Sequence, residues 1–400
     1  MARRPLQPLA PTTSDADLDL ALRRLAAALD GSGPALVPVP SDRRGAAVLA
    51  MARPDEPLEA EPAGEEIALV VPTSGSTGVV KGALLPASAL RHSATAGLDR
   101  LGGAGQWLLA LPTTSIAGLA VLVRSLAGGT RPELLTTDDG FTVTAFVEAT
   151  GRLTGTRRYA ALVPTQIWRL TAGPPDGMAA LASYDAVLVG GAPLDTGLAA
   201  AATAAGARIV RTYGMTETCG GCVYEGAPLA DVEVRAPVDS PVELGGPVVF
   251  AGYRLRPDLS AAALRHEGTR RWHVTSDAGK IGADGLLRVR GRLDDIVITG
   301  GVTVPAWTVV GVLAGHPAVR RVEVLGVPDE EWGQRVVAFV VPRDRAAPPT
   351  LETLRAYGRP SLQTAALPRQ VVVLDAIPML PSGKPDRQAL LDLASAPRQR

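Results

Sequence analysis

Short apolar runs alternate with alanine-rich segments of helical spacing through the first half of this 400-residue chain, and this pattern constrains its fold most. The runs are continuous and do not alternate with polar residues, as is typical of strands covered on both faces. Alternation of strands with helices favours an α/β fold with a largely parallel interior sheet. The expected strands are 67–71, 107–111, 159–163, 186–189 and 208–211, and the expected helices are about 88–99, 117–127, 141–150 and 194–205.

Two further segments complete the expected large domain. An opening helix is predicted over about residues 15–30, because apolar positions recur at helical spacing and Ser14 is a suitable cap. Residues 1–60 give little else. Glycine, proline and β-branched residues dominate residues 231–289, which predicts a small antiparallel or barrel-like β section.

The end of the chain has the pattern of a separate, smaller domain. A compact α+β segment is expected from about residue 295, with strands at 319–327 and 335–341 and a last helix near 386–394. We therefore predict a large N-terminal domain over residues 1–293 and a small C-terminal domain over residues 294–400.

Composition and charge narrow the classes of partner. Forty basic residues balance forty acidic ones, so no global attraction to nucleic acid or to an anionic membrane is expected. The amino terminus has arginines and prolines but no apolar core segment, which argues against a secretory signal. No run is long and apolar enough to span a bilayer. These observations predict a cytoplasmic protein.

The two cysteines of the chain, Cys219 and Cys222, form a Cys-Gly-Gly-Cys unit. Such a pair suggests redox chemistry or zinc binding. However, a tetrahedral zinc site needs about four ligands, and the four histidines are scattered along the chain. We expect the pair to serve packing or loop geometry, with the redox or zinc role as the alternative.

Only three of the forty basic residues are lysines, and two of them lie in glycine-bearing motifs. One motif runs from residue 73 to residue 82, directly after an apolar run. Its glycines allow close backbone approach, its hydroxyls and N–H groups can donate to an anion, and its lysine adds a mobile charge. We predict a phosphate-binding loop that comprises Thr73, Ser74, Gly75, Ser76, Thr77, Gly78 and Lys81.

Four further segments gain meaning when they are taken together with this loop. They are Thr212–Glu217, Thr275–Asp277, Gly291–Asp295 and Pro381–Arg387. Taken alone, a Ser/Gly-rich segment is often an ordinary loop, and lone carboxylates are more often solvated or capping groups. In this order, over roughly residues 67–390, the motifs resemble the adenylate-forming superfamily of acyl-CoA synthetases, nonribosomal peptide adenylation domains and luciferases.

The resemblance implies that a carboxylate is joined to the α-phosphate of ATP, with pyrophosphate expelled, and that the acyl group then passes to CoA. It implies Mg²⁺ bound by Glu217, because a hard cation that bridges phosphates prefers carboxylate oxygen. Thr216 would donate to the α-phosphate, and Tyr213 would stack on or flank adenine. The other ATP or AMP contacts implied are Gly191, Ala192, Gly214, Met215, Asp277 at the ribose hydroxyls, and Arg292 at ribose or phosphate.

The resemblance also implies a role for the lysine near the end of the chain. Lys384 would neutralise charge at the reacting phosphorus, which is most effective in a dry, preorganised site. In the family this lysine belongs to a small mobile domain, and Asp294 matches the hinge. Closure against water would protect the reactive acyl-adenylate between the two half-reactions.

The chain most resembles the short o-succinylbenzoate:CoA ligases of menaquinone biosynthesis in four segments, Leu111–Ser125, Leu162–Gln166, Val189–Pro193 and Tyr213–Cys222. That substrate has one carboxylate to be activated and a second one that must be held. Arg124 matches the arginine implied to hold the second carboxylate, since a planar guanidinium suits bidentate binding. A helix arginine that faces solvent is the alternative. The other implied acid-binding residues are Ser115, Thr165 and Gly190.

Two departures from the family pattern leave alternatives open. Ser115 occupies a position where many relatives have histidine, and residues 302–307 replace the usual segment after Gly301. The first could alter the acid pocket, and the second could alter contacts with CoA. A CoA ligase for another aryl or fatty acid is therefore an alternative, as is a noncatalytic nucleotide-binding protein of the same fold.

Overall fold

The computed structural model describes residues 4–56, 58, 66–74, 80–136, 140–237, 240–293, 295–379 and 385–395. The chain folds into two compact units. Unit 1 comprises Met1–Arg235, Glu243–Thr275 and Ile281–Leu287, and unit 2 comprises Ala236–Val242, Ser276–Lys280 and Arg288–Arg400. The predicted boundary residue Asp294 lies outside the described residues.

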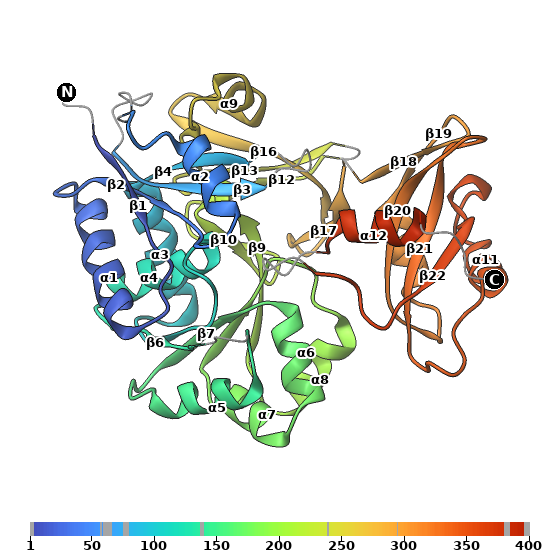
Figure 1. The fold of residues 1–400 in the computed structure, drawn as a ribbon, viewed down its shortest axis with the longest axis horizontal. Coiled ribbons are helices and arrows are strands. Elements are labelled where there is room, and N and C mark those ends of the chain that lie inside the picture. Colours follow the sequence, from blue (N-terminus) through green and yellow to red (C-terminus); the bar gives the residue numbers. More distant parts are fainter. Residues whose placement is uncertain are drawn as a thin grey trace. The chain divides into compact units, whose positions relative to one another are not determined.

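A seven-stranded sheet forms the centre of unit 1, in the order β11-β10-β9-β8-β7-β5-β6 (Figure 1). The five strands from β6 to β9 are parallel, and β10 pairs antiparallel with β9. The bounds are β5 Gln106–Leu109, β6 Glu133–Leu134, β7 Arg158–Leu162, β8 Ala186–Val189, β9 Ile209–Met215, β10 Gly220–Tyr224 and β11 Ala227–Pro228. The prediction of a largely parallel interior sheet is confirmed.

Helices cover both faces of this sheet, which explains why its strands β5, β7 and β8 are mostly buried. One face packs under α5 Val143–Arg152, α6 Pro164–Ala172, α7 Pro175–Ala182 and α8 Thr196–Ala204, in a core that includes Phe146 and Tyr184. On the other side lie α1 Asp15–Asp30, α3 Ala87–Leu101 and α4 Ile116–Ala127 (Figure 1). The helices predicted at 15–30, 88–99, 117–127, 141–150 and 194–205 are thus present, with small shifts at their ends.

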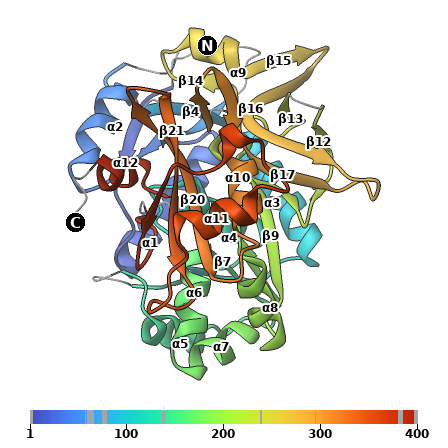
Figure 2. The same ribbon diagram turned by 90° about the vertical axis from the view of Figure 1, so that its right-hand side faces the viewer.

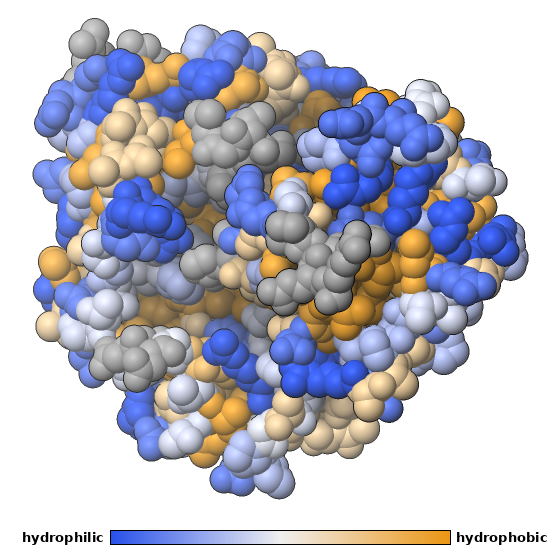
Figure 3. Space-filling view, turned by 45° about the vertical axis from the view of Figure 1, so that its right-hand side comes forward, coloured by the Kyte–Doolittle hydropathy of each residue, from blue (hydrophilic) through white to orange (hydrophobic). Residues whose placement is uncertain are grey.

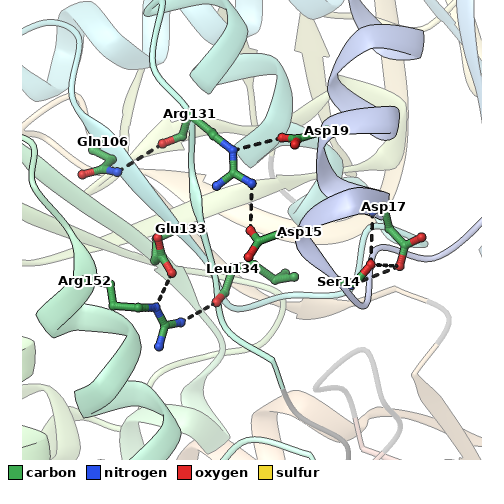
Figure 4. A network of polar contacts seen from close by, with 9 residues as sticks. All are labelled: Ser14, Asp15, Asp17, Asp19, Gln106, Arg131, Glu133, Leu134 and Arg152. Carbon is green, nitrogen blue, oxygen red and sulfur yellow. Dashed lines mark hydrogen bonds and ion pairs between the residues drawn. The ribbon is translucent and has the colours of Figure 1, made fainter.

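Polar contacts join helix α1 to the neighbouring part of unit 1 (Figure 4). Ser14 and the third residue of the helix form a capping box, which confirms Ser14 as the cap. The guanidinium of Arg131 donates to Asp15 Oδ1 at 2.7 Å and to Asp19 Oδ1 at 3.0 Å. Because these side chains are exposed, each pair adds at most about 1 kcal/mol, and the buried apolar face of the helix holds it in place.

A second sheet in unit 1 corrects the sequence-based assignment of one strand. The order β1-β2-β3-β4-β14 unites β1 Leu6–Leu9, β2 Ala35–Pro38, β3 Ile67–Ser74, β4 Val80–Pro86 and β14 Gly252–Tyr253. The apolar run at 67–71 was expected in the parallel sheet, but β3 pairs antiparallel with β4 in this separate sheet. The sequence did not predict strands β1 and β2, because four-residue strands with prolines give little periodic signal. Helix α2 Arg44–Ala52 was not predicted either.

The predicted antiparallel section is confirmed as a five-stranded sheet in the order β12-β13-β16-β15, with β17 paired to β16. Its strands are β12 Glu233–Arg235, β13 Pro241–Gly245, β15 Leu264–Glu267, β16 Arg270–Ile281 and β17 Leu287–Arg292, and α9 Pro257–Ala263 precedes β15. Strands β13 and β16 contribute residues to both units.

Unit 2 contains a further five-stranded sheet with helices on both faces (Figure 2). Its elements are β18 Ile296–Thr299, β19 Val302–Pro305, α10 Ala306–Leu313, β20 Val319–Asp329, β21 Gly333–Pro342, α11 Leu351–Gly358, β22 Gln370–Val373 and α12 Arg387–Ser395. Alternate residues of β21 face two different cores, Val336 with α10 and α11, and Phe339 with α12. The strands predicted at 319–327 and 335–341 and the last helix are confirmed.

Several large apolar side chains are exposed, among them Trp168 in unit 1 and Ile298 in unit 2. Figure 3 shows hydrophobic residues interspersed with hydrophilic ones on one face of the molecule. Scattered exposure of this kind is ordinary. Among the helices that the structure describes, none has the length and apolar character needed to cross a bilayer.

Candidate active site

Four segments expected in the site lie at the carboxyl ends of neighbouring parallel strands. Ser115 follows β5, Thr165 follows β7, Gly190 follows β8, and Tyr213 lies near the end of β9. Because β5, β7, β8 and β9 are adjacent and parallel, these segments meet at one edge of the sheet. Open α/β sheets bind ligands at this edge. The topology therefore brings together acid-binding and nucleotide-binding candidates that are far apart in sequence.

Close packing explains two of the glycines at this edge. A Cβ on Gly190 would lie 2.5 Å from Thr212 Oγ1, and one on Gly214 would lie 2.2 Å from the carbonyl oxygen of Gly220. Gly191 has φ +83°, a conformation that favours glycine, and Ala192 after it is half-buried.

The ends of the predicted phosphate loop are strands. Thr73 pairs with Lys81 and Ser74 with Val80, so β3 and β4 extend into the segment expected to be loop. β-branched residues at 73 and 80 favour this extension. Gly75, Ser76, Thr77 and Gly78 lie outside the described residues. The ammonium nitrogen of Lys81 lies 5.4 Å from the ring centroid of Tyr253.

Glu217 is the buried carboxylate of the candidate site. It lies in the short 3-10 helix η2 Thr216–Thr218 between β9 and β10, with 8% of its surface exposed, while Thr216 is half-buried. Tyr253 Oη donates to Glu217 Oε1 at 2.7 Å, and the Phe250 N–H donates to the Glu217 carbonyl oxygen at 2.9 Å. Burial, and secondarily the Glu217 carboxylate, raise the pKa of Tyr253, so its phenol stays a donor.

The fit of Glu217 to a metal ion can be judged from its partners. Its second oxygen, Oε2, forms no hydrogen bond or ion pair with any described residue. The described residues include no group of three or more side chains that could hold a metal ion. A single buried carboxylate of this kind fits Mg²⁺ whose remaining ligands are phosphate and water oxygens, as is common for this ion.

Arg124 is buried in α4, with 4% of its surface exposed, which excludes the solvent-facing alternative. Its Nη2 donates to Tyr224 Oη at 3.3 Å, and its guanidinium carbon lies 5.3 Å from the ring centroid of Trp107. Among the described residues, its Nε has no hydrogen-bond partner and no carboxylate pairs with it. The gap beside it, lined by Ser93 and Ala120 among others, is too small to hold a water molecule. A buried cation with neutral neighbours is suited to bind an anion.

Ser115 has a structural role at the start of α4. Its hydroxyl donates to the Pro112 carbonyl oxygen at 2.9 Å and accepts from the Gly118 N–H at 3.5 Å. Thr165 is half-buried in the first turn of α6. Both residues therefore lie at helix starts beside the sheet edge, where backbone N–H groups favour anions.

The remaining predicted residues belong to unit 2 or lie outside the described residues. Asp277 is half-buried in β16, and Arg292 Nη1 lies 4.0 Å from its Oδ1 at the end of β17. A carboxylate beside a guanidinium at this distance can accept hydrogen bonds from hydroxyls while its charge is balanced. Asp294 and Lys384 lie outside the described residues.

The cysteines are buried free thiols. Cys219 adopts a left-handed backbone, φ +54°, that ends η2. Burial raises the pKa of Cys222 to about 12. Both features agree with a packing and turn role next to Glu217.

Sequence reasoning missed the two tyrosines that contact the buried charges, Tyr253 and Tyr224. Tyr253 follows Glu217 by 36 positions and Tyr224 follows Arg124 by 100 positions. No periodic pattern links residues so far apart. The pair Gly252-Tyr253 after an apolar run was the available local signal.

Comparison with known proteins agrees with this fold and identifies the family. Residues 12–258 match the family of AMP-binding enzymes, and residues 311–384 match the C-terminal domain of AMP-binding enzymes. The chain belongs to the AMP-binding enzyme family, which confirms the resemblance found in the sequence.

The similar proteins include acid–CoA ligases. A probable 2-succinylbenzoate–CoA ligase of Mycobacterium tuberculosis is 45% identical over 93% of this chain and 94% of its own length. A feruloyl-CoA synthase of Amycolatopsis sp is 32% identical over 82% of this chain and 70% of its own length. The solved structure of a variant of E. coli MenE with bound OSB-AMS has a TM-score of 0.74 and 25% identity over 98% of this chain and 88% of that one.

Proposed function

We propose that this chain is an ATP-dependent o-succinylbenzoate:CoA ligase that acts in menaquinone biosynthesis. The observation that carries the choice of acid is Arg124, a buried cation that no described carboxylate pairs with. The high identity to the probable 2-succinylbenzoate–CoA ligase along nearly the whole chain supports the same choice. We also propose the cytoplasm as its location, where ATP and CoA are available.

The reaction has two steps. First, a carboxylate oxygen of the acid attacks the α-phosphorus of ATP and pyrophosphate leaves. Second, the sulfur of CoA attacks the acyl carbon, the thiol proton is lost, and AMP leaves with the electron pair of the broken C–O bond. The activated acid is held as a mixed anhydride between these steps, so exclusion of water prevents its hydrolysis.

Residues of the nucleotide half take the following roles in this proposal. Thr216 donates to the α-phosphate, and Tyr213 flanks adenine. Asp277 accepts the ribose hydroxyls, with Arg292 beside it. Lys384 balances charge at the reacting phosphorus. The phosphates and adenosine are further contacted by Thr73, Ser74, Gly75, Ser76, Thr77, Gly78, Lys81, Gly191, Ala192, Gly214 and Met215.

Glu217 would hold Mg²⁺ through its second carboxylate oxygen. When bound, such an ion would supply positive charge to offset the negative charge of the ATP phosphates. The burial of Glu217 and the hydrogen bond to its Oε1 fix the direction in which Oε2 points.

The acid half holds the two carboxylates of the substrate apart. Arg124 binds the ring carboxylate, while Ser115, Thr165 and Gly190 border the carboxylate to be activated. We further propose that residues 1–293 and 294–400 are the functional domains and that Asp294 is the hinge about which the smaller one turns between the two steps.

Mass spectrometry of products formed from ATP, Mg²⁺, CoA and o-succinylbenzoate tests the proposal directly. We expect o-succinylbenzoyl-CoA and AMP, and we expect Lys384→Ala to lower pyrophosphate release by about 10²- to 10³-fold. A panel of acids separates the alternatives. Faster turnover of ferulate, benzoate or a fatty acid than of o-succinylbenzoate would reassign the substrate, and ATP binding without pyrophosphate release for any acid would indicate a noncatalytic protein.

A further inference from the structure

We propose that Tyr253 is a positioning residue that sets Glu217 and Lys81 for the metal–ATP complex, an inference that rests on the proposed function. The tyrosine hydroxyl occupies one oxygen of the carboxylate, and its ring lies beneath the lysine ammonium. In this arrangement the Glu217 carboxylate and the Lys81 ammonium do not form an ion pair with each other in the described part of the chain. Each stays available to the ligand.

The backbone around Tyr253 joins the two elements that carry these charges. The Phe250 N–H donates to the Glu217 carbonyl oxygen at 2.9 Å, and the Arg254 N–H donates to the Gly82 carbonyl oxygen at 2.8 Å. Between them, Tyr253 pairs with Ala83 in the β14–β4 ladder. Residues 250–254 therefore tie η2 to β4, next to Lys81.

The side chain of Tyr253 is held from several sides. It is 8% exposed, and its ring packs edge-on against Phe250 with centroids 4.9 Å apart. Its N–H donates to Ser260 Oγ at 2.8 Å, which fixes the backbone from which the ring projects. A ring held in this way offers its hydroxyl in one direction, and that direction is Glu217 Oε1, at 2.7 Å.

The two oxygens of the Glu217 carboxylate have different contacts. A phenol donor on Oε1 orients the carboxylate, while Oε2 has no partner among the described residues. The Lys81 ammonium is attracted to the negative face of the ring at 5.4 Å. No ion pair joins Lys81 to Glu217 in the described part of the chain. Tyr253 thus keeps a metal ligand and a phosphate ligand apart, each oriented.

Two substitutions separate the hydroxyl from the ring. Tyr253→Phe removes the donor and keeps the ring, whereas Tyr253→Leu removes both. Calorimetric titration of ATP without any acid, with and without Mg²⁺, measures binding independently of turnover. We expect Tyr253→Phe to weaken the Mg²⁺-dependent part of ATP binding by about 10- to 100-fold and to leave metal-free ATP binding unchanged. Tyr253→Leu should weaken metal-free ATP binding as well.

Tyr184→Phe is the matched control. Tyr184 is also a buried tyrosine of unit 1, and its hydroxyl lies 2.7 Å from Thr150 Oγ1 in the core under α5. This variant should lose a buried hydrogen bond and keep the wild-type Mg²⁺ dependence. Higher Mg²⁺ concentration should restore pyrophosphate release in Tyr253→Phe, with the KM for the acid unchanged.

The outcomes separate this inference from the proposed function. Equal Mg²⁺ dependence of ATP binding in wild type and Tyr253→Phe would overturn the role of Tyr253 alone. If the substrate assignment fails but Tyr253→Phe still shows the Mg²⁺ defect, the inference stands without it. Absence of Mg²⁺-dependent ATP binding in the wild-type protein would overturn both.

Discussion

Glu217 and Arg124 are two buried charged residues of unit 1, and they differ in the polar contacts that their side chains make. The Glu217 carboxylate accepts a hydrogen bond at 2.7 Å from Tyr253, whose ring also attracts Lys81. Arg124 has a phenol oxygen at 3.3 Å and an indole face at 5.3 Å, and its Nε has no partner among the described residues. The carboxylate is oriented, whereas the guanidinium is desolvated and only partly satisfied.

This difference fits the two tasks that an acid–CoA ligase combines. Activation by ATP is the same for every acid, so its metal ligand gains from a fixed direction. Selection of one acid requires differential affinity, and an unsatisfied buried cation gives extra affinity to an acid that carries a matching anion. The cost of burying Arg124 is then recovered only when the correct substrate binds.

Replacement of Glu217 by glutamine should give the largest effect. The amide keeps the shape and loses the charge that would hold Mg²⁺, so pyrophosphate release should fall by about 10²- to 10³-fold for every acid tried. Steady-state pyrophosphate assays with several acids measure this. A loss confined to one acid would break the comparison, because it would place Glu217 in acid selection.

Replacement of Arg124 by methionine should affect the acid alone. We expect the KM for o-succinylbenzoate to rise about 10- to 100-fold, since a hydrogen-bonded charge pair is lost. The ATP dissociation constant should be unchanged, and the melting temperature should hold or rise because a desolvated charge is removed. Arg124→Lys is the control, with the charge kept and the planar fork lost.

A substrate analogue tests whether Arg124 acts on the ring carboxylate. For 4-oxo-4-phenylbutanoate, which lacks the ring carboxylate, wild type and Arg124→Met should have similar KM values. A large difference between them for this analogue would show that Arg124 acts on something other than that carboxylate.

The loss of the tyrosine hydroxyl beside Arg124 should have a smaller effect. Tyr224→Phe removes one neutral partner of the guanidinium. A net hydrogen bond is worth about 1 kcal/mol, so the KM for o-succinylbenzoate should change by about 5-fold and the Mg²⁺ dependence of ATP binding should not change. A comparison of the kinetics of this variant and of Tyr253→Phe would show whether Tyr224 acts on Arg124 and Tyr253 acts on Glu217.

The buried thiols next to Glu217 should show the smallest effect. Burial raises the pKa of Cys222 from 9.0 to about 12, and the thiolate is the reactive form. Native protein should therefore resist iodoacetamide at pH 8 to 9, and unfolded protein should react at both cysteines. Because the folded pKa is the higher one, this group favours the folded state below about pH 9, and its contribution is lost as pH rises toward 12. Rapid native labelling would contradict this burial.

Much of the fold could be predicted from periodicity. The run at 186–189 matches β8 at both ends, and the helix at 15–30 matches α1 because Ser14 marks its start. The run at 67–71 was assigned to the wrong sheet, since an apolar run gives the burial of a strand but not its neighbours. The same limit explains why Thr73 and Lys81 were placed in a loop: their pairing depends on both strands at once.

The sequence by itself determined the α/β plan, the order of the motifs and the residue types available for chemistry, because these depend on local spacing. Only the tertiary structure decided that Arg124 is buried beside Tyr224 and that Tyr253 lies between Glu217 and Lys81. Those contacts join strands and helices distant in the chain, and burial and hydrogen bonding set the energy of a charge through its neighbours in space.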